Sequence, residues 1–427
     1  MPAFEKDGIP RVEALDYVVD GCWEPILNAK CDWTFGMVNL LTVLECALNR
    51  GALLMKNPSL LRGQKKSYAT KDIGEMTSFD DLLKAVRFHI DFFTDMVGLG
   101  IYRFYTIDAS VTPTPFFSAL LGSCLLKGID KTWGGADYIL GGILSTAAPN
   151  CANALLSIKK FVFEEKKYSL EQVVAALRNN YVGYDDMLNE FKKASKYGNS
   201  LEDVDSIMRW LMDEFYESVQ ESKVLCDKIF LSKPDGDDAA RIDALRNLAG
   251  YSGESMKERF GEDFTIYFTS GSGTFGQYAS MGKGVAASAD GRKANEPIAP
   301  NCSPVSGTAI NGIGHIFSSM QKLNLSRFAA GVMIDICIDD KYSAPDIAHI
   351  LSKFVANGGN LMSVSPADAG MLKQVKTLCD EVRAGSKPPS VLNPYTWLSV
   401  RVGGWNAPFV TLTDEQQDDY LKRIMRG

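Results

Sequence analysis

Residues 401–410 read RVGGWNAPFV, a pair of adjacent glycines between an apolar run and a polar tail. The preceding residues 395–400, YTWLSV, favour a strand, and the following residues 412–421 have the pattern of a helix. Thr413 is placed to cap that helix, and the acidic residues after it suit the positive end of the helix dipole. Two glycines at such a strand-to-loop transition permit a tight turn or a close backbone approach.

A second distinctive stretch lies near the amino end, where residues 21–25 read GCWEP. Pro25 disfavours a helical conformation at Glu24, so this stretch is predicted to be a loop. In an extended loop, residues i and i+2 lie on the same side, which places the Glu24 carboxyl beside the Cys22 thiol. A single cysteine is usually an inert apolar residue. The neighbouring carboxyl is what makes Cys22 a candidate for chemistry.

The two stretches, taken in this order, resemble the glycyl radical enzymes, the family of pyruvate formate-lyase. In that family a glycine near the carboxyl end stores an unpaired electron, and a cysteine in a Gly-Cys-x-Glu-Pro loop becomes a thiyl radical. The resemblance implies that Gly404 bears the radical, that Cys22 abstracts hydrogen from the substrate and that Glu24 is the general acid or base. Glycine suits a Cα radical because a Cβ atom would crowd the planar centre and the approaching sulfur.

Other stretches support the resemblance or limit it. Residues 289–297, ADGRKANEP, resemble a family segment in which proline usually stands at Ala289, and Ser303-Pro304 continues the correspondence. Residues 271–276, GSGTFG, fit the GxGxxG pattern of dinucleotide-binding folds, but no helix is expected to open there. We therefore interpret this glycine loop as a close backbone approach to the active centre. Residues 361–366 depart from the family's Gln-x-Asn strand, so some substrate contacts are expected to differ.

The fold implied by the resemblance is α/β: the carboxyl-terminal half of a ten-stranded α/β barrel with surrounding helices, a cysteine loop and a glycyl radical loop. Residues 1–290 are expected to form part of the pyruvate formate-lyase-like barrel domain, and residues 291–427 the glycine radical domain. Family chains are about twice as long, so either a separate amino-terminal half associates with this chain or the chain is a truncated, inactive product. Half a barrel would leave open sheet edges and exposed apolar surface.

Local patterns predict individual elements of this fold. Ser169 and Gln172 form a capping box, and Ser78 or Asp80 begins another helix. Apolar periodicity predicts helices over residues 37–51 and 201–230, and strands over residues 264–269, 331–338 and 360–365.

Composition argues against several functional classes. The chain has 45 Lys and Arg against 52 Asp and Glu, a net charge of -7, which does not favour nucleic-acid binding. Its 9 cysteines include no Cys-x-x-Cys pair, which argues against a disulfide scaffold or zinc ribbon and fits a reducing, cytoplasmic setting. The amino-terminal residues are too polar for a signal peptide, and the apolar run 139–149 is too short to span a bilayer. The 3 histidines have no ligand spacing, so neither a metal site nor a bound cofactor is expected.

The sequence also bears on the reaction. Gly21 argues against pyruvate formate-lyase itself, which has a cysteine pair there, and Glu24 argues against the succinate-adding members. The Cys22 to Gly404 separation, 404 − 22 = 382 residues, is long for the dehydratases, and Gly-Gly-Trp resembles the arylacetate decarboxylases more closely. Decarboxylation of an arylacetate is therefore the expected reaction. The alternative is a dehydratase or a C–N or C–S lyase of a small diol or choline-like substrate.

The resemblance also implies partners. A radical-SAM activating enzyme would install the radical on Gly404, oxygen would cleave the chain there, and the enzyme would be a homo-oligomer acting on a small molecule. No nucleic-acid or membrane partner is expected. Two other classes stay open, an inactive fragment that keeps the fold and a repair subunit for a cleaved radical segment. The intact Cys22, Glu24 and Gly404 argue against the first, and the presence of the cysteine loop argues against the second.

Overall fold

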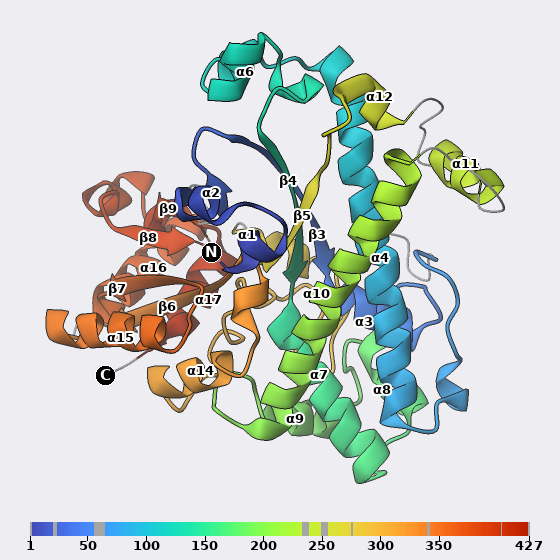
Figure 1. Ribbon diagram of the computed structural model, residues 1–427. Helices are drawn as coiled ribbons and strands as arrows, with labels where there is room; N and C mark the ends of the chain where they lie inside the picture. Colours follow the sequence, from blue (N-terminus) through green and yellow to red (C-terminus); the bar gives the residue numbers. More distant parts are fainter. Residues whose placement is uncertain are drawn as a thin grey trace.

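A computed structural model describes residues 2–19, 24–54, 65–232, 239–248, 255–274, 276–339, 342–402 and 404–425. A parallel β-sheet runs through the molecule, and long helices lie along it (Figure 1). The α/β class expected from the sequence is confirmed, whereas closure into a ten-stranded barrel stays a prediction. Within the described ranges, no helix is both long enough and apolar enough to cross a membrane.

Six strands form the sheet, all paired in parallel: β3 (Cys31–Asn39), β4 (Tyr138–Thr146), β5 (Tyr267–Ser272), β6 (Gly331–Asp339), β7 (Leu361–Ala367) and β10 (Ile424–Met425). Strands β3, β4, β5 and β6 follow one another across the sheet, and β6 also pairs with β7 and β10. Nearly all of β4 is buried, as expected of a central parallel strand covered on both faces. Among the described residues β3 pairs only with β4, and β7 only with β6, so the sheet has two open edges.

Helices connect successive strands. Those between β3 and β4 are α3 (Leu40–Leu48), α4 (Phe79–Val111), α5 (Pro115–Ser118) and α6 (Gly122–Lys127). Those between β4 and β5 are α7 (Ala148–Ile158), a π-helical turn (Lys159–Glu164), α8 (Leu170–Arg178), α9 (Asp185–Lys193), α10 (Glu202–Phe230), α11 (Ala239–Leu248) and α12 (Met256–Phe260). The later helices are α13 (Tyr278–Gly282), α14 (Ile313–Met320), α15 (Ala344–Ala356), α16 (Ala369–Arg383) and α17 (Asp414–Arg423). Short 3-10 turns cover Ile73–Glu75, Lys131–Trp133, Leu325–Arg327, Pro389–Tyr395 and Phe409–Thr411.

The two faces of the sheet are covered by different parts of the chain. A Cβ atom on Gly141 of β4 would lie 3.1 Å from Ile101 of α4, so this residue faces the long helices α4 and α10. Its neighbour Leu140 points to the opposite face, because successive residues of a strand alternate. There Leu140 joins a small core with Phe4 and Leu27. The amino-terminal helices α1 (Pro2–Lys6) and α2 (Arg11–Leu15) and the strands β1 (Tyr17–Val19) and β2 (Pro25–Leu27) therefore lie on the face away from α4.

Several predicted elements are confirmed. Helix α10 covers the range expected to be one long helix, and α8 begins with the capping box of Ser169 and Gln172. Thr413 caps α17, with Gln416 completing a second capping box. Helix α4 begins at Phe79, and Ser78 rather than Asp80 is the residue before it.

The helix predicted over residues 37–51 is wrong at its start. Met37 belongs to β3, where it pairs with Leu144 of β4, and the helix begins only at Leu40. The Asn39 side chain accepts hydrogen bonds from the backbone N–H groups of Leu41 and Thr42, at 3.1 and 3.4 Å, which sets this start. Apolar periodicity missed the boundary because both the strand and the helix are buried and apolar.

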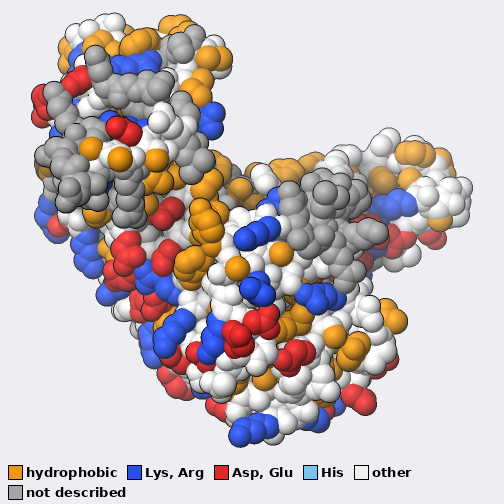
Figure 2. Space-filling view, turned by 90° about the vertical axis from the view of Figure 1, so that its right-hand side faces the viewer, with side chains coloured by type: hydrophobic (Ala, Val, Ile, Leu, Met, Phe, Trp, Pro, Cys, Tyr) orange, Lys and Arg blue, Asp and Glu red, His pale blue; other side chains and the backbone are white. Residues whose placement is uncertain are grey.

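Several large apolar side chains are exposed on the surface of the protein. Helix α4 leaves Phe88, Met96 and Val111 exposed, with 67% of Val111 accessible to solvent. Hydrophobic side chains are also visible between clusters of charge on the face shown in Figure 2.

Candidate active site

The glycine pair of residues 403–404 connects an antiparallel hairpin, β8 (Ser399–Val402) and β9 (Trp405–Pro408). Val402 pairs with Trp405, so Gly404 is the last residue of a two-residue turn. Gly404 has φ +111°, a conformation that side-chain-bearing residues rarely adopt, and it is buried. Gly403 lies outside the described residues. Because hairpin turns usually lie at the surface, burial of this one means that other segments close over it.

One of those segments is the glycine loop that follows β5. A Cβ atom on Gly276 would lie 2.5 Å from Nε1 of Trp405 and 3.0 Å from the carbonyl oxygen of Val402. Gly276 also has φ +73°, so it needs to be glycine for two independent reasons. The sequence-based interpretation of this loop as a close backbone approach fits the geometry, and the backbone that it approaches is the hairpin of Gly404.

The second predicted site segment lies at the start of β2. Residues 20–23, and with them Cys22, lie outside the described residues, so the structure does not place the thiol. Glu24 is buried, with 6% of its surface exposed. The next residue, Pro25, pairs with Val19 and has its Cδ atom 3.3 Å from where a Cβ atom of Gly331 would be. Glu24 is thus buried next to a proline that packs against the beginning of β6.

Both segments lie near the carboxyl end of β5. Gly331, beside Pro25, pairs with Gly271 of β5, and the adjacent Ala330 N–H donates to the Ser270 carbonyl oxygen at 3.0 Å. Gly276, beside the hairpin, follows Gly271 by five residues, in the loop after β5. The residue next to Glu24 and the hairpin of Gly404 are thus near the same end of one strand, although Glu24 and Gly404 are 380 residues apart in the chain (404 − 24).

A buried polar network that sequence reasoning missed supports this end of the sheet. The Thr274 N–H donates to Asn301 Oδ1 at 2.8 Å, and Asn301 Nδ2 donates to Asp335 Oδ2 at 2.6 Å. Asn301 has φ +52°, a conformation that asparagine tolerates better than most residues. Burial raises the pKa of Asp335, while Arg423, the Asn301 hydrogen bond and Arg401 oppose that shift. No sequence pattern could reveal the network, because its members come from separate elements.

Residues 289–297, which resemble a segment of the glycyl radical enzymes, are connected to other parts of the chain by hydrogen bonds. Asp290 accepts hydrogen bonds from Asn150 Nδ2 and Ser288 Oγ, both at 2.6 Å. Arg292 donates to the carbonyl oxygens of Val285 and Ala286. These contacts fasten the loop between β5 and β6 to helix α7 and keep its charged side chains engaged away from the hairpin.

The remaining reactive side chains are inert by environment. His89 is buried, and burial lowers its pKa to about 4. The eight cysteines within the described ranges are all buried and free. Burial raises the pKa of Cys46 and of Cys302 to about 12, which leaves these thiols protonated and poor nucleophiles. The described residues contain no group of three His, Cys, Asp or Glu side chains suited to a metal ion.

Curated relatives of this chain are lyases. The chain is 27% identical to a (2S)-3-sulfopropanediol dehydratase from Klebsiella oxytoca, with 98% of this chain and 45% of the relative aligned. It is 23% identical to a trans-4-hydroxy-L-proline dehydratase from Clostridioides difficile, over 91% of this chain and 43% of the relative. An isethionate sulfite-lyase from Oleidesulfovibrio alaskensis is 23% identical, with 99% of this chain and 46% of the relative aligned. The chain thus spans about half the length of the curated relatives that it matches.

Solved structures share the fold. A glycyl radical enzyme from Archaeoglobus fulgidus matches with a TM-score of 0.79 at 23% identity, over 99% of this chain and 48% of that chain. The glycerol dehydratase from Clostridium butyricum matches with a TM-score of 0.76 at 22% identity, over 99% of this chain and 47% of that chain.

The comparisons favour the alternative reaction over the one expected first. These relatives are dehydratases and a sulfite-lyase, not arylacetate decarboxylases. The dehydratase from Klebsiella oxytoca aligns with 98% of this chain, so the long spacing between Cys22 and Gly404 does not separate the decarboxylases from the dehydratases.

A family model described as "Pyruvate formate lyase-like" matches residues 1–233, which is more than half of the sequence. This chain belongs to the pyruvate formate lyase-like family of glycyl radical enzymes.

Proposed function

We propose that this chain carries the radical-bearing part of a glycyl radical lyase that eliminates water or sulfite from a small hydroxylated substrate. The observation that carries the proposal is that Pro25, the residue after the buried Glu24, and the hairpin of the buried Gly404 both lie near the carboxyl end of β5. The relatives named as dehydratases and as a sulfite-lyase support the reaction class. An activating radical-SAM enzyme, and a polypeptide that supplies the rest of the relatives' length, are proposed as partners.

The proposed chemistry begins with hydrogen-atom transfer. The radical at Cα of Gly404 takes a hydrogen atom from the Cys22 thiol, which restores an ordinary glycine and leaves a thiyl radical. The thiyl radical takes a hydrogen atom from the substrate carbon that bears the hydroxyl group. Both transfers require van der Waals contact between the reacting atoms, so their rates depend on how exactly the surrounding loops hold them.

Glu24 then acts as the general base for the substrate hydroxyl group. Its carboxylate accepts the proton of the substrate hydroxyl, and the group on the neighbouring carbon leaves with its bonding electron pair as a carbonyl forms. If the leaving group is hydroxide, the proton on Glu24 passes to it and forms water. If it is sulfite, that anion leaves directly. The product radical finally takes a hydrogen atom back from Cys22, which regenerates the thiyl radical.

The first test is anaerobic electron paramagnetic resonance after incubation with a radical-SAM activating enzyme. The chain is measured alone and together with a polypeptide that supplies the remaining half of the relatives' length. We expect a doublet that Gly404→Ala abolishes, because alanine at φ +111° is strained and its Cβ blocks the planar radical centre. Absence of the signal in both preparations would support the inactive-fragment alternative and refute the proposal.

The second test concerns the reaction. Activated protein is incubated with 3-sulfopropanediol, trans-4-hydroxy-L-proline, isethionate, glycerol and phenylacetate, and products are followed by mass spectrometry. Release of water or sulfite supports the proposed class. Release of carbon dioxide from phenylacetate alone would restore decarboxylation and overturn the proposed elimination.

A further inference from the structure

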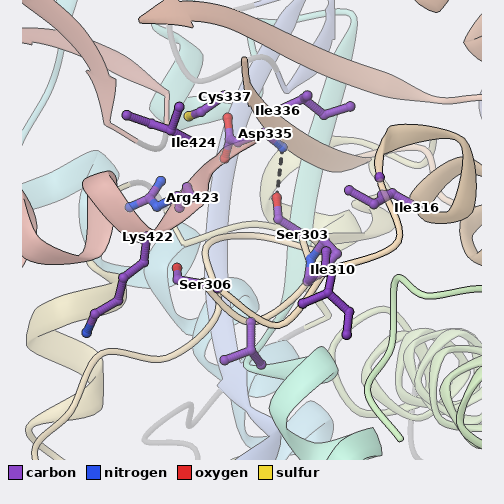
Figure 3. Close-up of a pocket in the computed structure, with 15 residues that line it drawn as sticks. Ser303, Ser306, Ile310, Ile316, Asp335, Ile336, Cys337, Lys422, Arg423 and Ile424 are labelled. Carbon is purple, nitrogen blue, oxygen red and sulfur yellow. Dashed lines mark hydrogen bonds between the residues drawn. The ribbon is translucent and has the colours of Figure 1, made fainter. Parts of the chain in front are cut away.

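A pocket lies beside β6. Its volume is about 330 Å³, a size typical of small-molecule sites. Four parts of the chain line it: the loop from Ser303 to Gly312, Ile316 of α14, the middle of β6, and Lys422–Ile424 near the carboxyl end (Figure 3). Neither Glu24 nor the turn of the hairpin contributes to the lining.

The pocket exists because the hydrogen-bond ladder along one edge of β6 is interrupted. At this edge β5 pairs only with Gly331 and Val332, and β10 pairs only with Cys337 and Ile338. The residues between them are met by a loop instead of a strand, with Asp335 N–H donating to Ser303 Oγ at 2.8 Å. A loop cannot fill the space that a strand and its side chains would occupy, so a hollow remains.

Polar atoms that lack protein partners line this hollow. Among the described residues, Asp335 Oδ1, Ser306 Oγ and Arg423 Nη1 are buried without a hydrogen-bond partner. Arg423 is only 8% exposed, and its Nε donates to Asp419 at 2.7 Å while its guanidinium stacks over the Tyr278 ring. Buried polar atoms left unpaired are costly, so these three atoms point to a ligand that would pair with them.

The pocket holds charges of both signs. Lys422 and Arg423 lie on one side and Asp335 lies above them, whereas Ile310 and Ile316 lie on the other side (Figure 3). Asp419 pairs with Arg423, and Arg423 also acts on the Asp335 carboxylate. The Lys422 side chain is exposed and forms no ion pair with another described residue. Lys422, the Asp335 carboxylate and the apolar wall therefore match a molecule that carries one anionic group, one cationic group and a hydrocarbon chain.

We propose that this pocket binds an aliphatic α-amino acid. Its carboxylate would lie toward Lys422 and Arg423, its ammonium group toward Asp335, and its side chain against Ile310 and Ile316. Ser306 would add a hydrogen bond to the carboxylate. Because neither Glu24 nor Gly404 is among the described residues that line the pocket, this is a binding site in addition to the site of the proposed lyase.

The test is isothermal titration calorimetry on the unactivated full chain with three probes. L-valine has both charged groups, isovalerate lacks the ammonium group and isobutylamine lacks the carboxylate. We expect saturable 1:1 binding of L-valine, with each of the other two binding about 10- to 100-fold more weakly, since each loses a charge-assisted hydrogen bond. No radical is needed, so failure of this test leaves the proposed lyase untouched.

Variants sharpen the assignment. Asp335→Asn should remove the preference for L-valine over isovalerate, an effect that a merely structural role would not produce. Lys422→Ala should weaken L-valine and isovalerate alike but leave isobutylamine unchanged, and Lys353→Ala on α15 is the control for loss of a surface lysine. The proposal is overturned if L-valine does not bind at millimolar concentrations, if all three probes bind equally, or if neither pocket variant alters the preference.

Discussion

Two antiparallel hairpins differ in how they hold their reactive residues within an otherwise parallel structure. The hairpin of β8 and β9 has a two-residue connection, so the pairing of Val402 with Trp405 by itself fixes where Gly404 lies. The hairpin of β1 and β2 has a five-residue connection, residues 20–24, between Val19 and Pro25. Strand pairing does not fix where a residue of so long a connection lies, so the position of Glu24 depends on its own burial and on the packing of Pro25.

The burial of the two hairpins differs in the same way. β8 places Val400 and Val402 in the core, whereas all three residues of β1 are exposed. Gly404 is thus held by backbone geometry and burial, whereas Glu24 is held by its own burial and by the packing of Pro25 against the start of β6. Substitutions at the two hairpins should therefore have different effects on turnover, radical yield and stability.

The largest expected effect comes from Glu24→Gln. Removing the general acid or base should lower turnover of the substrate by about 10²- to 10⁴-fold while leaving the glycyl radical signal intact. Turnover by mass spectrometry and radical yield by electron paramagnetic resonance are measured on the same activated sample. Glu75→Gln, at an exposed position, is the control. Equal turnover in both variants would remove Glu24 from the mechanism.

The second-largest effect should come from Gly276→Ala, which acts on the hairpin of β8 and β9. The new Cβ atom would meet the hairpin at 2.5 and 3.0 Å, so we expect about 2–4 kcal/mol of destabilisation and a lower radical yield. Gly358→Ala is a matched control, because Gly358 has the same φ of +73° but no atom within 4 Å of its Cβ position. Urea denaturation compares the two, and equal losses would mean that only backbone strain matters and that the hairpin contact does not.

Asn301→Ala should cost about 2–3 kcal/mol, because it removes the acceptor of Thr274 and the donor to Asp335 inside the protein. Asn311→Ala is the comparison, since Asn311 is exposed and its side chain donates a single bond, at 3.3 Å, to Asn199. Thermal unfolding gives the difference. If both variants melt together, the network does not support the end of β5.

The smallest effect should come from Gly331→Ala beside Pro25. The Cβ atom would meet the movable end of Leu361 at 2.3 Å and Pro25 at 3.3 Å, so we expect about 1–2 kcal/mol beyond the cost of its φ of +89°. Gly312→Ala, with φ +88° and open space around it, isolates that backbone cost. Reduced turnover in Gly331→Ala without reduced radical yield would place the damage at the thiol-bearing segment.

The sequence predicted helices, strands and caps, which depend on neighbouring residues. It did not predict sites that are formed by residues from separate parts of the chain. Helix α10, the capping box of α8, the Thr413 cap of α17 and the strands β6 and β7 follow from periodicity and cap residues, which neighbouring positions set. The identity of Glu24 and Gly404 as candidates came from short motifs, and the placement of Pro25 and of the Gly404 hairpin near one end of β5 could be seen only in the fold. The Asn301 network and the pocket beside β6 left no trace in the sequence, because each joins residues from three or more separate segments.

The strand β10 gives the chain an unusual response to damage at Gly404. If oxygen broke the backbone there, the fragment from Trp405 onward would still be held by the pairing of Ile424 and Met425 with β6 and by the buried Arg423. The nicked protein would migrate as a single species in a native gel and as two bands after denaturation. Loss of activity in air would then leave the folded shape in place, and thermal unfolding would be a poor monitor of inactivation.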